Sequence, residues 1–317
     1  MQEYTFQMLD SDEVNVFVYR WAPEEEMPIK GIVQVAHGMS ETAKRYKELA
    51  ECLTNHGFII YANDHRGHGK TAFDQGMLGD GGPDAFKWMV KDMGELGKFI
   101  QQEHPGLPIF LLGHSMGSFL TQKVMYTGPD LYAGYILTGS NGKRSLLKFG
   151  QLLAQLQSLI QGKQRRSFLL NAVVFGGFNR SFRPAATPFD WLSRDEQEVR
   201  KFIDDPLCGS LCTARFYQGF FELLMEIHLP HHLADIPKDK PVYIFSGGND
   251  PVGMYGKGVL NLVEMYKELG IRDLEYRIYP EGRHEMLHEI NRKEVEEHVA
   301  DWLLRHVTPS PSPSPSV

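Results

Sequence analysis

The stretch that decides the fold reads Ile109-Phe110-Leu111-Leu112-Gly113-His114-Ser115-Met116-Gly117. Four apolar residues, typical of a buried strand, run into a pentapeptide of the form G-x-S-x-G, and a helical pattern follows at 116–126. Glycines flank such a serine where a strand turns sharply into a helix, because side chains there would collide. The pattern predicts that Ser115 lies on a strained turn with its hydroxyl exposed.

Working outward from this turn, short apolar runs alternate with amphipathic segments, which predicts a mostly parallel central sheet flanked by crossover helices. We expect strands at 15–21, 31–36, 57–63, 107–112, 134–139, 241–246 and 273–279. We expect helices at 43–56, 84–103, 116–126, 258–269 and 293–306. The first strand alternates and carries charges, so we place it at an antiparallel edge.

One interval, residues 141–234, interrupts this alternation because it contains helical patterns and no convincing strand. We interpret it as a helical cap, or lid, inserted into a core made of residues 1–140 and 235–307. The end of the chain, residues 308–317, alternates Pro and Ser and cannot form a core, which predicts a disordered tail.

The predicted cap has an apolar stripe and an unusual charge. The stripe recurs at helical spacing and consists of Leu146, Phe149, Leu153, Leu156 and Ile160. Between Leu131 and Phe189 there is no Asp or Glu, whereas eight Lys and Arg residues fall there. Two hypotheses follow: the stripe packs the cap onto the core, or it rests on an anionic membrane as a peripheral contact.

The composition is that of a globular chain, with 317 residues, 42% hydrophobic and 23% charged. The net charge of −7 argues against nucleic acid as a partner, because phosphate binding needs a concentrated basic face. No signal peptide or membrane-spanning run is evident at the sequence level. The three cysteines fit a reducing compartment, so we expect a cytoplasmic location. Oligomeric state is not indicated.

A serine nucleophile needs amides that stabilise the oxyanion. The amide of Met116 follows the serine at a helix N-terminus, where the helix dipole favours negative charge. The strand at 31–36 runs straight into His37-Gly38-Met39-Ser40, so the Met39 amide is our candidate for the second donor. A simple turn at His37-Gly38 is the alternative.

Serine also needs a histidine to take its proton and a carboxylate to hold that histidine. In this type of site the chain order is Ser, acid, His, and the groups lie at the carboxyl ends of strands. Asp250 follows the strand at 241–246, and His284 follows the strand at 273–279, whereas Asp239 and Asp273 precede theirs. We predict the triad Ser115, Asp250 and His284, with His288 as the alternative base.

The remaining histidines are assigned structural roles. His65 and His68 also end a strand but precede the serine, so we expect them to stabilise a loop. No cluster of Asp, Glu, His or Cys has a spacing that demands a metal, and Cys208 and Cys212 lack further ligands. We therefore expect neither a metal nor a cofactor.

Seven motifs together resemble the monoacylglycerol lipase and lysophospholipase group of α/β-hydrolases. They are the segments at 36–39, 62–69, 113–117, 188–193, 204–209, 246–251 and 282–285, and the likeness covers roughly residues 10–305. The resemblance implies the α/β-hydrolase fold, the triad and oxyanion amides named above, and a cap that encloses an apolar acyl site. Ser40 and Ser118 stand where glycine is common in the family.

The expected activity is hydrolysis of single-chain lipid esters, monoacylglycerol or lysophospholipid, through an acyl-Ser115 intermediate. We expect substrate contacts from His37, Gly38, His114, Leu146 and Phe149. Alternatives are an esterase for short-chain, aromatic or peptide-like substrates, a cofactor-free haloperoxidase, and a non-catalytic binding module on a hydrolase scaffold.

Overall fold

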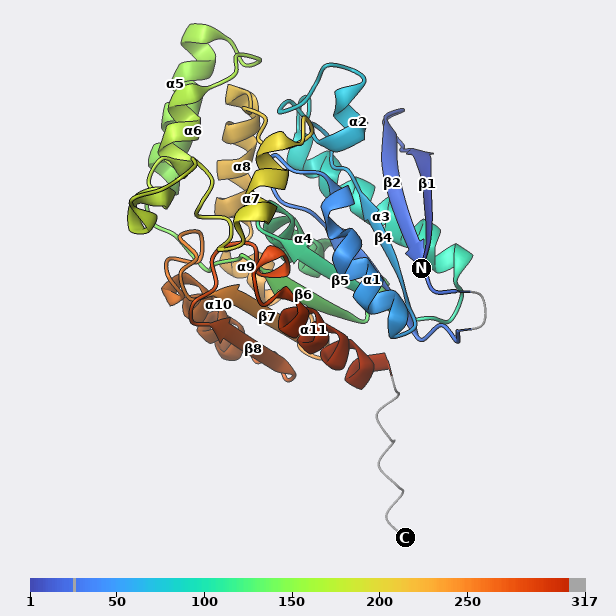
Figure 1. Ribbon diagram of the computed structural model, residues 1–317. Helices are drawn as coiled ribbons and strands as arrows, with labels where there is room; N and C mark the ends of the chain where they lie inside the picture. Colours follow the sequence, from blue (N-terminus) through green and yellow to red (C-terminus); the bar gives the residue numbers. More distant parts are fainter. Residues whose placement is uncertain (25–26, 308–317) are drawn as a thin grey trace.

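The computed structural model describes residues 1–24 and 27–307, which are built around one eight-stranded sheet (Figure 1). The strand order is β1-β2-β4-β3-β5-β6-β7-β8. Strand β2 pairs antiparallel with β1 and β4, and the other neighbours pair parallel. The strands are β1 (Gln2–Leu9), β2 (Asn15–Ala22), β3 (Gly31–Ala36), β4 (Phe58–Asn63), β5 (Ile109–His114), β6 (Gly134–Thr138), β7 (Val242–Gly247) and β8 (Leu274–Tyr279). The predicted α/β-hydrolase fold is confirmed.

Helices cover both faces of the sheet. The α-helices are α1 (Lys47–Asn55), α2 (Gly69–Phe73), α3 (Ala85–Glu103), α4 (Met116–Thr127), α5 (Leu147–Gln161), α6 (Phe168–Phe175), α7 (Glu196–Asp204), α8 (Ala214–Glu226), α9 (Pro230–Ala234), α10 (Lys257–Glu268) and α11 (Arg292–Val307). Short 3₁₀ turns are η1 (Ala43–Tyr46), η2 (Pro129–Leu131), η3 (Phe178–Phe182) and η4 (Met286–His288).

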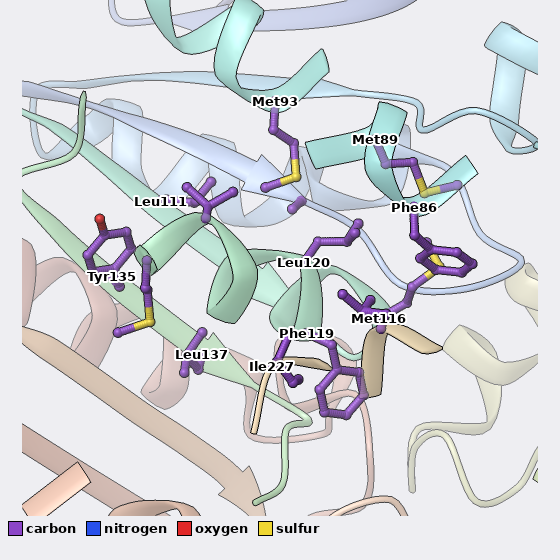
Figure 2. Close-up of a cluster of buried hydrophobic side chains, with 14 of the residues drawn as sticks. Phe86, Met89, Met93, Leu111, Met116, Phe119, Leu120, Tyr135, Leu137 and Ile227 are labelled. Carbon is purple, nitrogen blue, oxygen red and sulfur yellow. The ribbon is translucent and has the colours of Figure 1, made fainter. Parts of the chain in front are cut away.

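Alternating side chains of the central strands divide the core into two clusters. On one face of β5, Phe110 packs with α1 and α11, where its ring lies 5.8 Å from that of Trp302. On the other face, Leu111 packs with residues of α3 and α4 such as Met93 and Leu120 (Figure 2). A strand buried on both faces reads as a continuous apolar run, which is why β5 is so clear in the sequence.

The edge of the sheet differs from the prediction. The segment 15–21 is antiparallel, as expected, but it is not the edge, because β1 pairs along its whole length from Gln2 opposite Ala22 to Leu9 opposite Asn15. No side chain of β1 is fully buried. A strand that buries so little lacks the apolar alternation by which strands are found in a sequence.

Residues 139–241, all described, connect β6 to β7 through helices α5–α9 and hold no strand beyond a single bridge between Arg166 and Thr213. The division into a core and a cap at 141 and 234 stays a prediction, and the predicted tail at 308–317 lies outside the described residues. Among the described helices, none combines the length and apolar character needed to cross a bilayer.

The apolar stripe of α5 faces away from the protein. Helix α5 packs on α8 through small residues, and a Cβ added to Gly150 would lie 2.6 Å from the ring of Phe221. Four of the five stripe residues are exposed, with fractions of 82% for Leu146, 63% for Phe149, 47% for Leu156 and 80% for Ile160. Only Leu153 packs against the core. The hypothesis that the stripe packs the cap onto the core is therefore wrong for most of it.

Helix α4 approaches the sheet so closely that only glycine fits at its second residue. A Cβ at Gly117 would lie 2.0 Å from the carbonyl oxygen of Ala36 at the end of β3. A Cβ at Gly113 would lie 2.4 Å from the carbonyl oxygen of Gly117. The two glycines let the start of α4 touch the ends of β3 and β5 at once.

We predict opposite effects for two Gly→Ala substitutions in helices. Gly117→Ala should lower the free energy of unfolding by at least about 2 kcal/mol, because backbone atoms must shift to admit the methyl group. Gly94→Ala, in α3, should raise it by about 0.5–1 kcal/mol, since nothing lies within 4 Å of the added Cβ. Denaturant unfolding measures both, and equal stabilities would contradict the close approach.

Candidate active site

Ser115 occupies the sharp turn between β5 and α4. Its backbone has φ 51° and ψ −118°, a conformation that non-glycine residues adopt only under strain. Its amide donates to the carbonyl of Thr138 at 2.9 Å, which ties the turn to β6. The side chain does not cap the helix, so the hydroxyl is not committed to the helix that it begins.

Asp250 and His284 lie together, although the chain separates them by 34 residues. The Nδ1 atom of His284 lies 3.0 Å from Oδ1 of Asp250, and both side chains are buried. Asp250 is itself held by the amide of Val252 at 2.8 Å and the hydroxyl of Ser246 at 3.3 Å. Because a carboxylate accepts, Nδ1 donates, and Nε2 is left with a free lone pair.

Burial and charge act in opposite directions on His284. Burial alone would lower the pKa of its imidazole, but the charge and hydrogen bond of Asp250, with smaller contributions from Glu285 and Glu41, outweigh burial and raise the pKa above its ordinary value. Asp250 thus both orients the ring and stabilises its protonated form.

A pocket of about 480 Å³ brings together five of the ten predicted site residues, whereas the predicted substrate contact His37 does not line it. At one end it is lined by Gly38, Met39, Ser40, His114, Ser115 and His284. Elsewhere its wall is largely aromatic and aliphatic, with Phe168, Phe175, Phe189, Trp191, Leu192 and Phe202. Leu146 and Phe149, predicted to contact substrate, do not line this pocket and lie on the exposed side of the α5 region.

His37 lies behind the pocket and shapes the loop that follows β3. Its Nε2 accepts from the amide of His65 at 2.9 Å, so Nδ1 carries the proton and donates to the carbonyl of Gly38 at 2.7 Å. His65 and His68 are buried beside it, and desolvation lowers the pKa of both, to about 3 for His68. The burial of these two histidines beside His37 is consistent with the loop-stabilising role that we expected for them.

Two further histidines lie near the base. His114 lies with its ring 4.8 Å from that of His284, and burial, with the neighbouring charge of His284, lowers its pKa to about 4. His288, the alternative base, has its Nε2 3.1 Å from the carbonyl of Arg45. The structure brings His284, not His288, to Asp250.

Ser40 and Ser118 both donate side-chain hydrogen bonds, one to a distant segment and one within its own turn. Ser40 has φ 58°, and its hydroxyl donates to the carbonyl of Ser210 at 2.8 Å. The hydroxyl of Ser118 donates to the carbonyl of Ser115 at 2.6 Å. Both contacts brace the turns on either side of the pocket.

A buried ion pair near the pocket was missed by sequence reasoning. Arg45 donates to both carboxylate oxygens of Glu285 at 2.7 Å and to Glu41 at 2.7 Å. Glu41 also accepts from the amide of Gly38. The pairing keeps the pKa of Glu285 well below its usual range despite burial. In the sequence, only the spacing of four residues between Glu41 and Arg45 indicates a contact. Glu285 gives no such signal because it lies 240 residues from Arg45 along the chain.

Among the residues that the structure describes, two groups of side chains could offer metal ligands within 4.8 Å of one another. One is Cys52, His56 and Glu297, and the other is Asp273, Glu275 and His306. Neither group belongs to the pocket described above. In each group two members lie close together in the sequence and the third comes from α11, so sequence spacing alone did not indicate either group.

Comparisons with known proteins identify the family of the chain and several relatives. The family model described as "Serine aminopeptidase, S33" matches residues 27–291. Human monoglyceride lipase is 29% identical over 283 residues, covering 89% of this chain and 83% of its own. Monoacylglycerol lipase of Mycolicibacterium smegmatis is 26% identical and covers 90% and 92%. A carboxyl esterase from Bacillus coagulans, solved with glycerol, superposes with a TM-score of 0.90 at 28% identity, covering 97% and 100%.

We predict that Asp250→Ala lowers the pKa of His284 below about 6.5, the value of an unperturbed histidine. Without the carboxylate, only burial and the weaker charges of Glu285 and Glu41 act on the ring, and burial is the largest of these effects. A pH titration of the histidine ring resonances by NMR measures the change. Asp273→Ala, which removes a partner of His306, is the matched control and should leave His284 unchanged.

Proposed function

Because the chain belongs to the serine aminopeptidase S33 family and is a carboxylic ester hydrolase of the α/β-hydrolase fold, we propose that it cleaves single-chain lipid esters through an acyl-Ser115 intermediate. One observation carries the proposal: Ser115 and His284 border one largely apolar pocket, and Asp250 holds His284 from behind. The reaction needs no cofactor.

In the proposed reaction, Nε2 of His284 takes the proton of the Ser115 hydroxyl as Oγ attacks the ester carbonyl. The tetrahedral oxyanion accepts from the amide of Met116, at the start of α4, and from the amide of Met39, in the loop that follows β3. The carbonyl reforms, the alcohol leaves with the proton from His284, and the acyl group stays on Ser115. Nε2 of His284 then takes a proton from water as the water oxygen attacks the acyl ester. When the second tetrahedral intermediate collapses, His284 returns that proton to Oγ of Ser115, and the fatty acid and the free serine are released.

The acyl chain is the part of the substrate that the pocket suits best. A volume of about 480 Å³ lies in the range of sites that bury most of a small ligand, and the aromatic part of the wall offers apolar contact to an acyl chain. Two relatives bear the names monoglyceride lipase and monoacylglycerol lipase, which supports a glycerol ester with one chain. Lysophospholipid is the related substrate with a charged head group.

Other substrates share the same catalytic groups. One similar structure is named a carboxyl esterase, and the matching family model is described as a serine aminopeptidase. The alternatives are therefore cleavage of short or aromatic acyl esters and cleavage of peptide-like substrates. An esterase for short acyl esters and a lipase for long ones differ in how kcat/KM depends on the length of the acyl chain. A non-catalytic scaffold is disfavoured because Ser115, Asp250 and His284 are all present and the last two are in contact.

We also propose that the cap docks on an anionic membrane surface. The exposed apolar residues of α5, α6 and their flanks are Leu146, Phe149, Leu152, Leu156, Leu159, Ile160, Phe168, Leu169 and Val173. Basic residues lie among them in the sequence, and no acidic residue occurs between 131 and 189. An anionic membrane offers negative head groups to the basic residues and an apolar interior to the leucine and phenylalanine side chains. Unpaired cysteines at 52, 208 and 212 favour a cytoplasmic location.

We predict that kcat/KM rises with acyl length across a series of monoacylglycerols, by roughly fourfold per methylene that the pocket buries, until the pocket is filled. Ser115→Ala should abolish turnover throughout the series. Ser158→Ala is the matched control, since that hydroxyl is buried without a hydrogen-bond partner and lies in α5. A profile that peaks at acetyl or butyryl esters would favour the short-chain alternative, and an active Ser115→Ala would exclude the acyl-serine route.

We predict that Leu159→Glu weakens binding to vesicles of anionic phospholipid about tenfold, because burial of one leucine is worth about 1.5–3 kcal/mol. Leu260→Glu, on the exposed side of α10, is the matched control and should bind like the unaltered protein. Co-sedimentation at low and high salt measures both. Absence of binding at low salt, with self-association that Leu159→Glu removes, would show that the face meets a second copy of the chain.

A further inference from the structure

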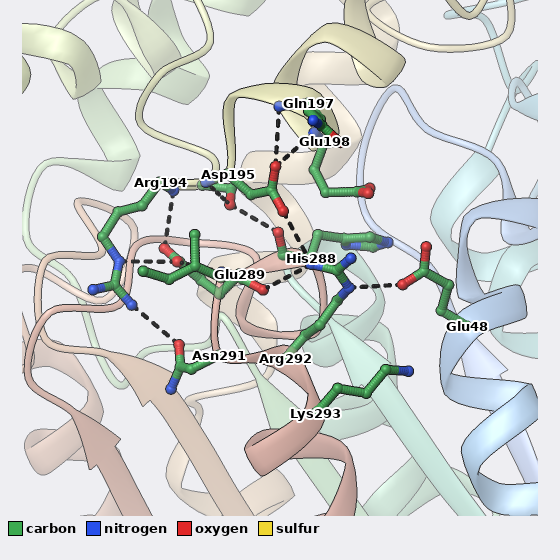
Figure 3. Close-up of polar contacts among 12 residues, drawn as sticks. Glu48, Arg194, Asp195, Gln197, Glu198, His288, Glu289, Asn291, Arg292 and Lys293 are labelled. Carbon is green, nitrogen blue, oxygen red and sulfur yellow. Dashed lines mark hydrogen bonds and ion pairs between the residues drawn. The ribbon is translucent and has the colours of Figure 1, made fainter.

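We propose that residues 190–195, here called the strap, hold His284 in its working position, with Arg194 and Glu289 as positioning residues. The inference rests on the proposed function, in which His284 is the general base. The strap belongs to the predicted cap, yet it is bonded to the loop at 283–291 that carries the base (Figure 3).

The backbones of the two segments are joined directly. The amide of His284 donates to the carbonyl of Trp191 at 3.3 Å, and the amide of Glu285 donates to Leu192 at 2.8 Å. The ring of Trp191 lies 5.0 Å from the imidazole of His284. The strap therefore contacts both the backbone and the ring of the base.

Arg283, the residue before His284, binds the strap through its side chain. Its guanidinium donates through Nη1 to the carbonyl oxygens of Asp190 and Ser193, the latter at 3.0 Å. The hydroxyl of Ser193 in turn donates to the carbonyl of His288 at 2.8 Å. The strap is thus held on both sides of His284 in the sequence.

Glu289 is the centre of the connection. Its side chain is fully buried, and Oε1 accepts from the amides of Arg283 at 2.9 Å and Arg194 at 3.1 Å. Its Oε2 accepts from Nε of Arg194 at 2.9 Å and from the amide of Ile290 at 3.0 Å. A buried carboxylate is stable only with such partners, so one side chain fixes the strap against the peptide that precedes the base.

The imidazole ring of His284 is held by a different contact from the one that holds its backbone. Asp250, which follows β7, holds Nδ1 of the ring, while the strap holds the backbone at His284 and Glu285. Two independent attachments restrict both the backbone and the ring. This is the arrangement that keeps a catalytic group within a fraction of an ångström of its productive geometry.

The test compares Arg194→Met with Arg215→Met. Arg215 likewise pairs with a carboxylate, since its Nε donates to Oδ1 of Asp80 at 2.6 Å and its Nη2 donates to Oδ2. Within the described part of the chain, the Arg215 side chain bonds neither to the strap nor to the loop at 283–291. Arg194→Met should lower kcat about tenfold to a hundredfold. The acid limb of kcat/KM should move to lower pH, because a loosened contact with Asp250 no longer raises the pKa of His284.

Arg215→Met should lower the thermal midpoint yet leave the acid limb in place. Arg194→Lys keeps a cation beside Glu289 and should recover part of the lost kcat, which keeps the test available if Arg194→Met does not fold. An unchanged acid limb and kcat in both Arg194 variants would overturn the inference. Ser115→Ala is assayed alongside: if it retained activity, the proposed function would fail, whereas its inactivity with unaffected Arg194 variants would reject the strap alone.

Discussion

The contact between Gly117 and the carbonyl of Ala36 is the constraint on which the rest of the site depends. With no side chain between them, α4 begins directly against the end of β3, and the chain can leave β5 only through the positive φ of Ser115. That turn brings the amide at the start of α4 beside the loop that follows β3. Nucleophile position and candidate oxyanion donors are therefore consequences of one steric condition between a helix and a strand.

Each buried charged group near the pocket contacts a group of opposite charge. Asp250 supplies the charge that outweighs desolvation at His284, while Arg45 offsets the two carboxylates of Glu41 and Glu285 close to the pocket. Buried charges of this kind are costly without partners, and each of these has at least one within 3.1 Å. The apolar wall opposite these groups leaves room for a neutral chain beside a strongly polar catalytic end.

Most of the sheet and the candidate triad could be predicted from the sequence, because buried parallel strands are continuous apolar runs and the rule of strand ends selects Asp250 over Asp273. Strand β1 escaped because it buries no side chain fully. The contacts of Glu285 and Glu289 escaped for another reason, since their partners lie about 95 to 240 residues away. Periodicity showed that α5 is amphipathic, but only the packing of Gly150 on Phe221 showed which side faces inward.

The strap also bears on how caps of this family can be exchanged between proteins. The interval that we predict to be the cap follows β6 and precedes β7, so a chimera that exchanges it joins the two chains at two points. Since residues 190–195 and 283–291 are bonded as a unit, a transplanted cap would meet a foreign partner loop at the base. The strap and the loop at 283–291 therefore function as one unit, although they come from two separate segments of the chain. A chimera has to take both segments from the same parent protein.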